Sequence, residues 1–352
     1  MKKINNFIKN FIKKGKSCFI IAEAGVNHNG NLNLAKKLVD AAKRAGVDAV
    51  KFQTFKTKNL VSKNTKMANY QKKNTGKKES QFDMLKRLEL RNRDFVKLKK
   101  YCDKQKIIFL STPHTEDAVD FLNNLVPAYK VASGDLTNSP LLKKISRKKK
   151  PIILSTGMAT LDEVREAVNT ILPINKKLIL LHCTTNYPCP LEEINLRAML
   201  TLKKNFNLLV GYSDHTSGII VPTIAVAMGA TVIEKHFTLD KNLPGPDHRA
   251  SLEPKELKEM VKSIRNVEKI LGAEKKKPTI SEKKIMRVIR KSLIAKVNIT
   301  KGIIIKKNML IAKRPGTGIN PKKINRIIGR VAKKNIEQDE LINWNMICQE
   351  KK

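Results

Sequence analysis

Between residues 19 and 272 the chain alternates short apolar runs with amphipathic segments of helical length, and this alternation constrains the fold more than any other feature. Helical patterns follow the runs, for example at Leu34–Ala45 and Leu161–Ile171. Eight strand–helix units in about 250 residues are typical of a TIM (β/α)8 barrel. A doubly wound sheet is the alternative, but no GxGxxG motif follows the first run. The predicted strands are Phe19–Ala24, Val47–Gln53, Ile107–Thr112, Ala128–Ser133, Pro151–Thr156, Lys177–Cys183, Leu208–Ser213 and Thr231–His236.

The sequence pattern changes after residue 272. Residues 273–284 are highly charged and contain a proline, which is typical of a linker. From residue 285 onward, short β-like runs alternate with turns, and cationic residues greatly outnumber acidic ones. We therefore expect a basic lead-in at 1–17, a TIM-barrel catalytic domain at 18–272, a linker at 273–284 and a small β-rich domain at 285–352.

The N-terminus and the cysteines bear on where the protein acts. Residues 1–17 are basic, but Asn and Lys interrupt their apolar residues and no small-residue cleavage site follows, so we expect no secretion signal. We expect no membrane partner, with a basic amphipathic contact of this segment with a membrane surface as the minor alternative. No run of 18 or more apolar residues predicts a membrane span. The five cysteines form no CxxC pair, which favours reduced thiols and a cytoplasmic location.

The chain has 71 Lys and Arg residues against 31 Asp and Glu, a formal net charge of +40. Such a charge is typical of many nucleic-acid-binding proteins. Here the cations are spread through every segment, aromatic residues make up only 5%, and no RNA- or DNA-binding motif is present. We therefore expect no specific nucleic-acid partner. The excess is interpreted as solvated surface lysine, which also attracts anionic substrates.

One interval is too long for a simple connection between a strand and a helix. Residues 54–81 are polar, rich in Lys and Asn, and follow the second predicted strand. Loops of this length in a compact domain are usually functional or disordered. Because the interval follows the carboxyl end of a barrel strand, a loop that covers the substrate is one interpretation.

Two histidines follow consecutive predicted strands within the segment 211–254. His215 and His236 each lie in a polar cluster where a strand is expected to end. The carboxyl ends of neighbouring parallel strands lie side by side, so the two imidazoles are placed to meet over one cation, for which neutral imidazole is a common ligand. Two unrelated histidines that happen to end strands are the alternative, since the sequence identifies no third ligand.

Polar side chains gather at the predicted carboxyl ends of nearly all the strands. In a barrel these ends surround the active-site mouth, where an enzyme needs cations and hydroxyls and a structural protein gains nothing from them. Lys51 and Lys130 come from different strands and can clamp a phosphate. Its remaining oxygens can accept hydrogen bonds from Ser133, Ser155 and Ser213. The other polar residues at these ends are Glu23, Asn27, His28, Gln53, Ser111, Thr112, Asp135, Thr156, Thr185 and Tyr187.

Short motifs in a fixed order carry a family resemblance. They are AEAGVNHNG (22–30), VKFQT (50–54), FLSTP (109–113), YKVASGD (129–135), ILSTGM (153–158), LHCTTNYP (181–188), GYSDHT (211–216), EKHFTLD (234–240), PGPDHRASLEP (244–254) and KRPGTG (313–318). Together they resemble the bacterial sialic acid synthase family, which includes N-acetylneuraminate and legionaminic acid synthases. The resemblance extends over residues 18–345.

Members of this family have a TIM barrel followed by an antifreeze-like (SAF) β-clip domain and form domain-swapped homodimers. They condense phosphoenolpyruvate with an N-acylated amino sugar. The resemblance implies an N-acetylneuraminate synthase, which converts phosphoenolpyruvate, N-acetylmannosamine and water to N-acetylneuraminate and phosphate by C–C bond formation with C–O cleavage. A legionaminic acid synthase acting on 2,4-diacetamido-2,4,6-trideoxymannose is the alternative.

The resemblance also implies roles for individual residues. His215 and His236 would bind a divalent metal, with Mn²⁺ expected and Mg²⁺ or Co²⁺ as alternatives. The positions implied for phosphoenolpyruvate are Lys51, Thr112, Lys130, Ser133, Ser155, Thr185 and Ser213. Those implied for the sugar are Gln53, Asn74, Tyr187, Asp247 and Arg314, the last reaching the N-acyl group from the partner's second domain. The expected catalytic residues are Glu23, which would handle protons, Lys51, Asp247 and Arg314.

Two positions depart from the family pattern, and other functions stay open. Asp135 stands where Glu is common, and Thr185 stands where relatives have an amide or a hydroxyl.

An aldolase that forms a Schiff base through Lys51 or Lys130 is a second enzymatic hypothesis. A basic nucleic-acid-binding protein on a non-catalytic barrel is a third. Ice binding by the second domain is disfavoured by its many lysines.

Overall fold

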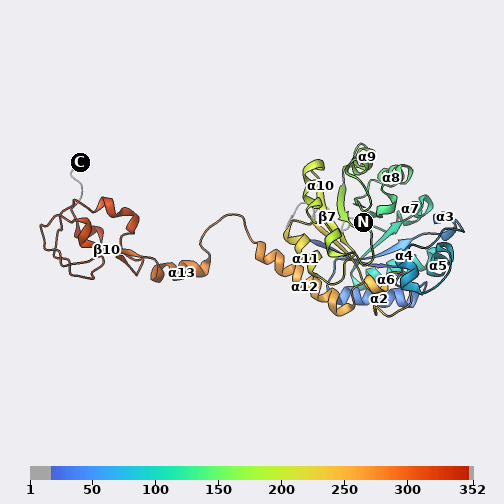
Figure 1. The fold of residues 1–352 in the computed structure, drawn as a ribbon, viewed down its shortest axis with the longest axis horizontal. Helices are drawn as coiled ribbons and strands as arrows, with labels where there is room; N and C mark the ends of the chain where they lie inside the picture. Colours follow the sequence, from blue (N-terminus) through green and yellow to red (C-terminus); the bar gives the residue numbers. More distant parts are fainter. Residues whose placement is uncertain (1–16, 349–352) are drawn as a thin grey trace. The chain divides into compact units, whose positions relative to one another are not determined.

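The computed structural model describes residues 17–348, and the chain divides into two units, Met1–Gly272 and Ala273–Lys352 (Figure 1). Residues 1–16 of the predicted lead-in lie outside the described residues. The first unit contains eight parallel strands in the order β3-β2-β1-β8-β7-β6-β5-β4, and β3 and β4 pack against each other to close the barrel. The TIM-barrel prediction is therefore confirmed. The strands are β1 (Phe19–Gly25), β2 (Ala49–Thr54), β3 (Ile108–Pro113), β4 (Tyr129–Val131), β5 (Ile152–Ser155), β6 (Leu178–Cys183), β7 (Leu209–Asp214) and β8 (Val232–His236).

Helices surround the strands of this unit (Figure 1). Local capping sets their ends: Thr160 and Glu163 form a capping box at the start of α9, and Gly46 ends α2 in a left-handed conformation, with φ at 82°. Asn31 caps α2, so this helix begins two residues before the predicted Leu34. The helices are α2 (Leu32–Ala45), α3 (Thr57–Leu60), α4 (Asn69–Thr75), α5 (Gln81–Leu88), α6 (Asn92–Gln105), α7 (Glu116–Leu122), α8 (Ser139–Arg147), α9 (Leu161–Ile171), α10 (Ala198–Phe206), α11 (Ile220–Ala227) and α12 (Pro254–Leu271).

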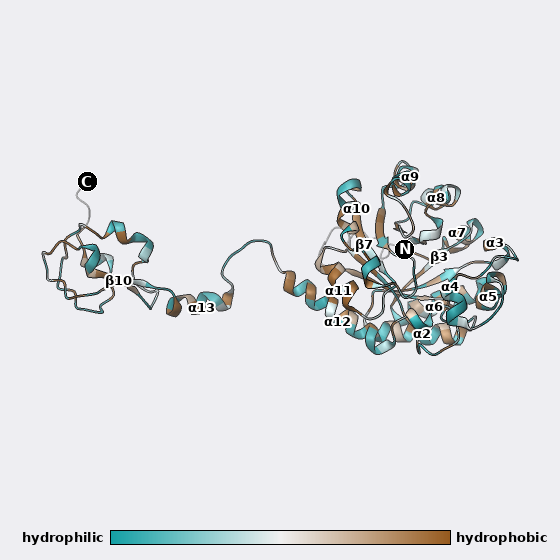
Figure 2. Cartoon of the chain, viewed as in Figure 1, coloured by the Kyte–Doolittle hydropathy of each residue, from teal (hydrophilic) through white to brown (hydrophobic). Residues whose placement is uncertain are grey.

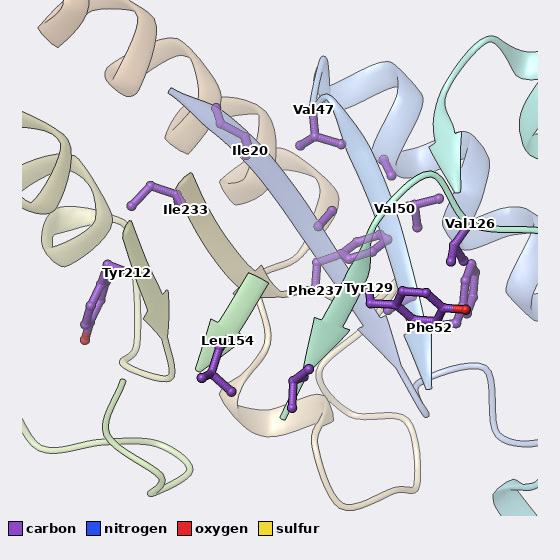
Figure 3. Close-up of a cluster of buried hydrophobic side chains, with 14 of the residues drawn as sticks. Ile20, Val47, Val50, Phe52, Val126, Tyr129, Leu154, Tyr212, Ile233 and Phe237 are labelled. Carbon is purple, nitrogen blue, oxygen red and sulfur yellow. The ribbon is translucent and has the colours of Figure 1, made fainter. Parts of the chain in front are cut away.

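Successive side chains of each strand point to opposite faces, and the two faces bury different residues. The outer face packs against the helices in one large apolar cluster, to which Ile20, Val50 and Ile233 belong (Figure 3). The inner face is apolar only toward the amino ends of the strands, where Ile21 and Leu110 belong to a smaller cluster. Further along the strands the inner face becomes polar, and this change of character defines the site.

The long interval after β2 is ordered and carries two short helices, α3 and α4. Beneath them, Phe55, Met67 and Met84 are buried in an apolar cluster of their own with Val26 and Leu88. Burial of these side chains explains why a polar, lysine-rich segment holds a fixed conformation beside the carboxyl ends of the strands.

The second unit has its own small apolar core, which includes Leu293, Ile305 and Ile342. Its strands β9 (Ser292–Ala295) and β10 (Leu310–Lys313) pair antiparallel. The helix α13 (Ile280–Ile289) spans residues 284 and 285, where the sequence places the end of the linker. The helix-like segment expected near Lys322 is a 3-10 helix at Pro321–Arg326.

Hydropathy along the chain follows this architecture (Figure 2). The most apolar helix, α11, is brown in Figure 2, but it has only eight residues. Among residues 17–348 no helix combines the length and the apolar character needed to cross a bilayer.

Candidate active site

The inward-facing residues at the carboxyl ends of the strands form one polar layer. Strand register places Glu23 of β1 directly between Lys51 of β2 and His236 of β8. These side chains border a pocket of about 120 Å³. The residues that line it are Glu23, Lys51, Gln53, Thr112, His114, Lys130, Ala132, Ser133, Gly134, Ser155, Cys183, Thr185, Tyr187, Ser213, His215, Glu234 and His236. The structure thus brings together most of the residues predicted to bind phosphoenolpyruvate, sugar and metal.

Two buried lysines and two buried carboxylates alternate at the base of the pocket. Lys51 Nζ lies 2.6 Å from Glu23 Oε2, and Lys130 Nζ lies 3.1 Å from Glu234 Oε1. Lys51 also lies 3.8 Å from Glu234 Oε2 and donates to the hydroxyl of Thr112. All four groups are shielded from water, so the charge of each is stabilised by its oppositely charged neighbours. A bound anion would meet two ammonium groups that are already in place.

The two carboxylates differ in their affinity for a proton. Burial raises the pKa of Glu23 above its ordinary value, although the Lys51 ammonium opposes this shift. Burial also opposes ionisation of Glu234, but there Lys130 and Lys51 together outweigh it and hold the pKa below its usual range. Glu234 is therefore the permanent anion of the site, and Glu23 is the carboxyl suited to exchange a proton.

Hydroxyl groups line the side of the pocket formed by β4, β5 and β6. The Oγ atom of Ser155 and the Oγ1 atom of Thr185 are buried and have no hydrogen-bond partner among residues 17–348. Ser133 Oγ accepts a hydrogen bond from the backbone N–H of Gly157 at 3.0 Å. A Cβ at position 157 would lie 2.3 Å from Thr185 Oγ1 and 2.8 Å from Ser133 Oγ, so only glycine allows this approach. Buried, unsatisfied hydroxyls are costly unless a ligand completes them.

His215 and His236 lie together, with ring centroids 5.5 Å apart. His215 Nδ1 is 2.7 Å from the carbonyl oxygen of Thr184. A carbonyl only accepts hydrogen bonds, so this nitrogen carries a proton, and in the neutral ring Nε2 is the nitrogen with the free lone pair. Burial, reinforced by the positive charges near His215 and Lys51, holds the pKa of His236 well below its ordinary value. His236 therefore presents the neutral form that binds metals, whereas at His215 the effect of burial is outweighed by Cys183, which raises the pKa of that imidazole.

The donor set around the two histidines fits a divalent cation. His236 Nδ1 is buried without a hydrogen-bond partner among the described residues, and the Asp247 carboxylate is 4.0 Å away. Within residues 17–348, no three His, Cys, Asp or Glu side chains converge closely enough to hold a metal by themselves. The described residues therefore offer two imidazoles and a nearby carboxylate, and the remaining ligands of a bound cation would come from substrate or water.

Asp247 lies on a loop that is fastened from several sides. Asn74 Nδ2 donates to the carbonyl oxygen of Pro246 at 2.6 Å, which links α4 to this loop. His248 Nδ1 lies 2.7 Å from Thr238 Oγ1 just after β8. These bonds hold the Asp247 carboxylate beside His236, and its role in sugar binding stays a prediction. Neither Asn74 nor Asp247 is among the residues that line the pocket, and the loop approaches the site through the contact of Asp247 with His236.

Burial raises the pKa of Asp247 from 3.8 to about 6, with the charge of Glu23 as a second cause. Above pH 6 the folded protein must therefore ionise a group that resists ionisation. We expect Asp247→Asn to raise the free energy of unfolding at pH 7.5 by up to about 3 kcal/mol in metal-free protein. The gain should shrink as the pH falls through 6 toward 4, because the wild-type carboxyl is then protonated in the folded state.

Urea unfolding followed by tyrosine near-UV circular dichroism at several pH values would measure this difference. The single tryptophan, Trp344, lies in the second unit, so its fluorescence provides an internal control that should not change. A variant less stable than wild type at pH 7.5, or a gain independent of pH, would show that burial does not strain Asp247.

Aromatic rings cover the histidine pair. The Tyr187 ring lies 4.1 Å from His215 and 5.6 Å from His236 between centroids. Tyr70 of α4 lies against Tyr187, with centroids 5.0 Å apart. The ordered interval after β2 therefore contributes to the roof of the site through Tyr70, a residue that the sequence did not single out.

The structure adds other residues that the sequence analysis did not assign to the site. Glu234 lies two residues before His236, so strand alternation alone could have placed it on the same inner face. The Cys183 Sγ atom lies 3.7 Å from His215 Nδ1, and His114 Nδ1 lies 3.3 Å from Asp135 Oδ2. Arg314 belongs to the second unit and is not among the residues that line the pocket, so its role stays a prediction.

Comparison with known proteins connects this geometry to a family. Residues 38–276 match the NeuB family and residues 290–347 match the SAF domain. An N,N'-diacetyllegionaminic acid synthase of Legionella pneumophila is 49% identical, with 97% of this chain and 99% of that protein aligned. One from Campylobacter jejuni is 51% identical over 93% of this chain and 99% of that protein.

A solved structure agrees with these matches. The crystal structure of an N-acetylneuraminic acid synthetase from Leptospira borgpetersenii superposes with a TM-score of 0.68 at 37% identity, covering 77% of this chain and 90% of that one. The family resemblance read from the motifs is thereby confirmed, and so is the SAF domain after the barrel. The chain belongs to the NeuB family, whose members include synthases of legionaminic and sialic acids.

Proposed function

We propose that this protein is a phosphoenolpyruvate-dependent synthase that makes N,N'-diacetyllegionaminic acid from 2,4-diacetamido-2,4,6-trideoxymannose. The observation that supports the reaction class is that one pocket brings together Lys51, Lys130 and unsatisfied hydroxyls with His215 and His236. An anionic enol phosphate and an aldehyde need such different environments side by side.

The pocket residues divide the work of the reaction. C3 of phosphoenolpyruvate attacks the aldehyde carbon of the open-chain sugar, water adds at C2, and phosphate leaves with C–O cleavage. Lys51 and Lys130 hold the phosphate, and Ser155 and Thr185 donate to its oxygens. Glu23, whose pKa burial raises, is placed to give a proton to the alkoxide formed from the aldehyde oxygen.

The histidine pair completes the proposed site. His215 and His236 would hold a divalent metal, for which we propose Mn²⁺ and retain Mg²⁺ and Co²⁺ as alternatives. When bound, such a cation polarises a carbonyl oxygen as a Lewis acid. Asp247 orients the sugar hydroxyls beside it. We also retain the expectation that Arg314 contacts the N-acyl group within a domain-swapped homodimer.

The choice of sugar differs from the one that the sequence motifs placed first. They favoured N-acetylmannosamine, with the trideoxy sugar as the alternative. The relatives that are about half identical over nearly the whole chain are N,N'-diacetyllegionaminic acid synthases, whereas the sialic acid enzyme is 37% identical. The comparisons therefore support the alternative better. The motifs did not separate the two because they come mainly from strand ends, which serve the shared chemistry.

Phosphate release by the purified protein with phosphoenolpyruvate and Mn²⁺ would test the proposal. We expect release to need both substrates, to stop with chelator, and to favour the trideoxy diacetamido sugar over N-acetylmannosamine by about 100-fold or more in kcat/KM. A preference for N-acetylmannosamine would restore the first prediction. Release with neither sugar would refute the proposed activity.

A further inference from the structure

A charged residue stands directly before each candidate metal histidine. Asp214 precedes His215 at the end of β7, and Lys235 precedes His236 in β8. Because side chains alternate across a strand, the histidines line the pocket while Asp214 and Lys235 are buried on the opposite side of the same strands. Both charged side chains are completely buried, with 0% of their surface exposed.

These two residues form the centre of a small bonded group. Asp214 and Lys235 are direct cross-strand partners, and Lys235 Nζ lies 2.5 Å from Asp214 Oδ2. Lys235 also donates to the carbonyl oxygen of Thr216, while Asp214 accepts from the Thr216 backbone N–H at 3.1 Å and from its hydroxyl at 3.0 Å. The residues on both sides of His215 are thus bonded to each other and to the strand that carries His236.

Stability alone is a weak reason for such a pair. Taking two charges out of water costs about as much as their attraction returns, and apolar residues of similar volume often replace a buried pair without loss. What an ion pair adds is a fixed geometry between the two strand ends. The ring of His215 is itself bonded through Nδ1 to the carbonyl oxygen of Thr184. The ring and the backbone on both sides of it are therefore fixed.

We propose that the Asp214–Lys235 pair positions His215 and His236, keeping the two imidazoles at the separation at which they bind one divalent cation. The pair acts through the backbone and touches neither substrate nor metal, so its members are positioning residues. This inference rests on the metal site proposed above. Residues that orient metal ligands in this way typically contribute 10- to 100-fold to metal affinity.

The double variant Asp214→Asn/Lys235→Met tests the proposal, because it removes both charges at nearly constant volume and should therefore still fold. Mn²⁺ affinity would be measured from the electron paramagnetic resonance signal of the free ion, and phosphoenolpyruvate affinity by calorimetry without metal. We expect Mn²⁺ to bind about 10- to 100-fold more weakly. Phosphoenolpyruvate should bind within about twofold of wild type, because its expected contacts do not include this pair.

A matched control uses an exposed ion pair on the outside of the barrel. Lys144→Met/Asp120→Asn removes a contact of 2.8 Å between α7 and α8 and should leave Mn²⁺ affinity unchanged. Unchanged Mn²⁺ affinity in the Asp214/Lys235 variant would overturn the inference, and so would an equal loss of both ligands, which indicates general loosening. If wild type binds no Mn²⁺ through His215 and His236, the proposed metal site fails and this inference with it.

A second variant covers the case in which the double variant does not fold. Thr216→Val keeps the ion pair and removes only the hydroxyl that bonds to Asp214. We expect Mn²⁺ to bind between about twofold and tenfold more weakly, the effect of one hydrogen bond. Wild-type affinity in this variant would count against the positioning role.

Discussion

Replacing His215 and His236 together by alanine is expected to abolish specific Mn²⁺ binding and to lower kcat/KM by about 10³-fold, equivalent to about 4 kcal/mol of transition-state stabilisation. The two rings lie 5.5 Å apart, and His236 Nδ1 has no hydrogen-bond partner among the described residues, so their loss removes the nitrogen donors of the proposed site. Phosphate release and Mn²⁺ titration, run in parallel on the same preparation, would measure both effects.

His182 offers a matched control on the neighbouring strand β6. Its ring packs against Tyr212 on the outer side of the barrel and bonds to the carbonyl oxygen of Ile194, away from the pocket. His182→Ala should therefore keep Mn²⁺ affinity and most of the activity. A His215/His236 double variant that retained activity within about tenfold of wild type would refute the proposed role of the metal pair.

Lys130→Met is expected to weaken both catalysis and folding. Lys130 pairs with the buried Glu234, whose carboxylate loses its closest cation when the ammonium is removed. Breaking a buried pair from one side costs about 3 kcal/mol or more. The loss of a phosphate-holding charge should also lower kcat/KM for phosphoenolpyruvate by about 100-fold, chiefly through a higher KM, because the charge contacts substrate and transition state alike.

The double variant Lys130→Met/Glu234→Gln separates these two effects. Neutralising the carboxylate removes the buried charge that has lost its closest cation, so we expect stability to return to within about 1 kcal/mol of wild type while KM stays high. Lys144→Met, which removes an exposed cation on α8, should change neither quantity. Recovery of activity together with stability in the double variant would mean that Lys130 does not hold the phosphate.

Most of the barrel could be predicted because its signals are local. The apolar runs and the helical periodicity between them place all eight strands within a few residues of their observed ends. The ends themselves depend on tertiary context: Ser133, expected to close the fourth strand, instead begins a 3-10 helix over Ser133–Asp135 that turns its hydroxyl toward Gly157. The helix α13 was missed because its apolar residues, such as Ile280 at 82% exposure, lie among lysines in a segment interpreted as linker and turns.

The site was predictable in so far as it follows from strand ends. Residues such as Lys51 and Ser155 belong to strands whose register is set by apolar alternation, so their convergence could be inferred. The pairing of Glu234 with Lys130 could not, because it joins strands four positions apart around the barrel. Tyr70 was also beyond reach, since the sequence does not reveal that Phe55 and Met67 would bury the segment that carries it.

The division between strand-borne and loop-borne residues has a consequence for how such enzymes diversify. Most of the groups proposed for phosphoenolpyruvate and metal, such as Lys51, Ser155 and His236, lie on the barrel strands, where a shift of register would displace them together. The groups around the sugar, such as Asn74 and Asp247, sit on connecting segments that meet through a single hydrogen bond to Pro246. We therefore expect a change of acceptor sugar to require substitutions mainly in these two segments, with the strand residues proposed for the condensation left unchanged. The same two segments are the ones to exchange between synthases when the aim is to change sugar specificity.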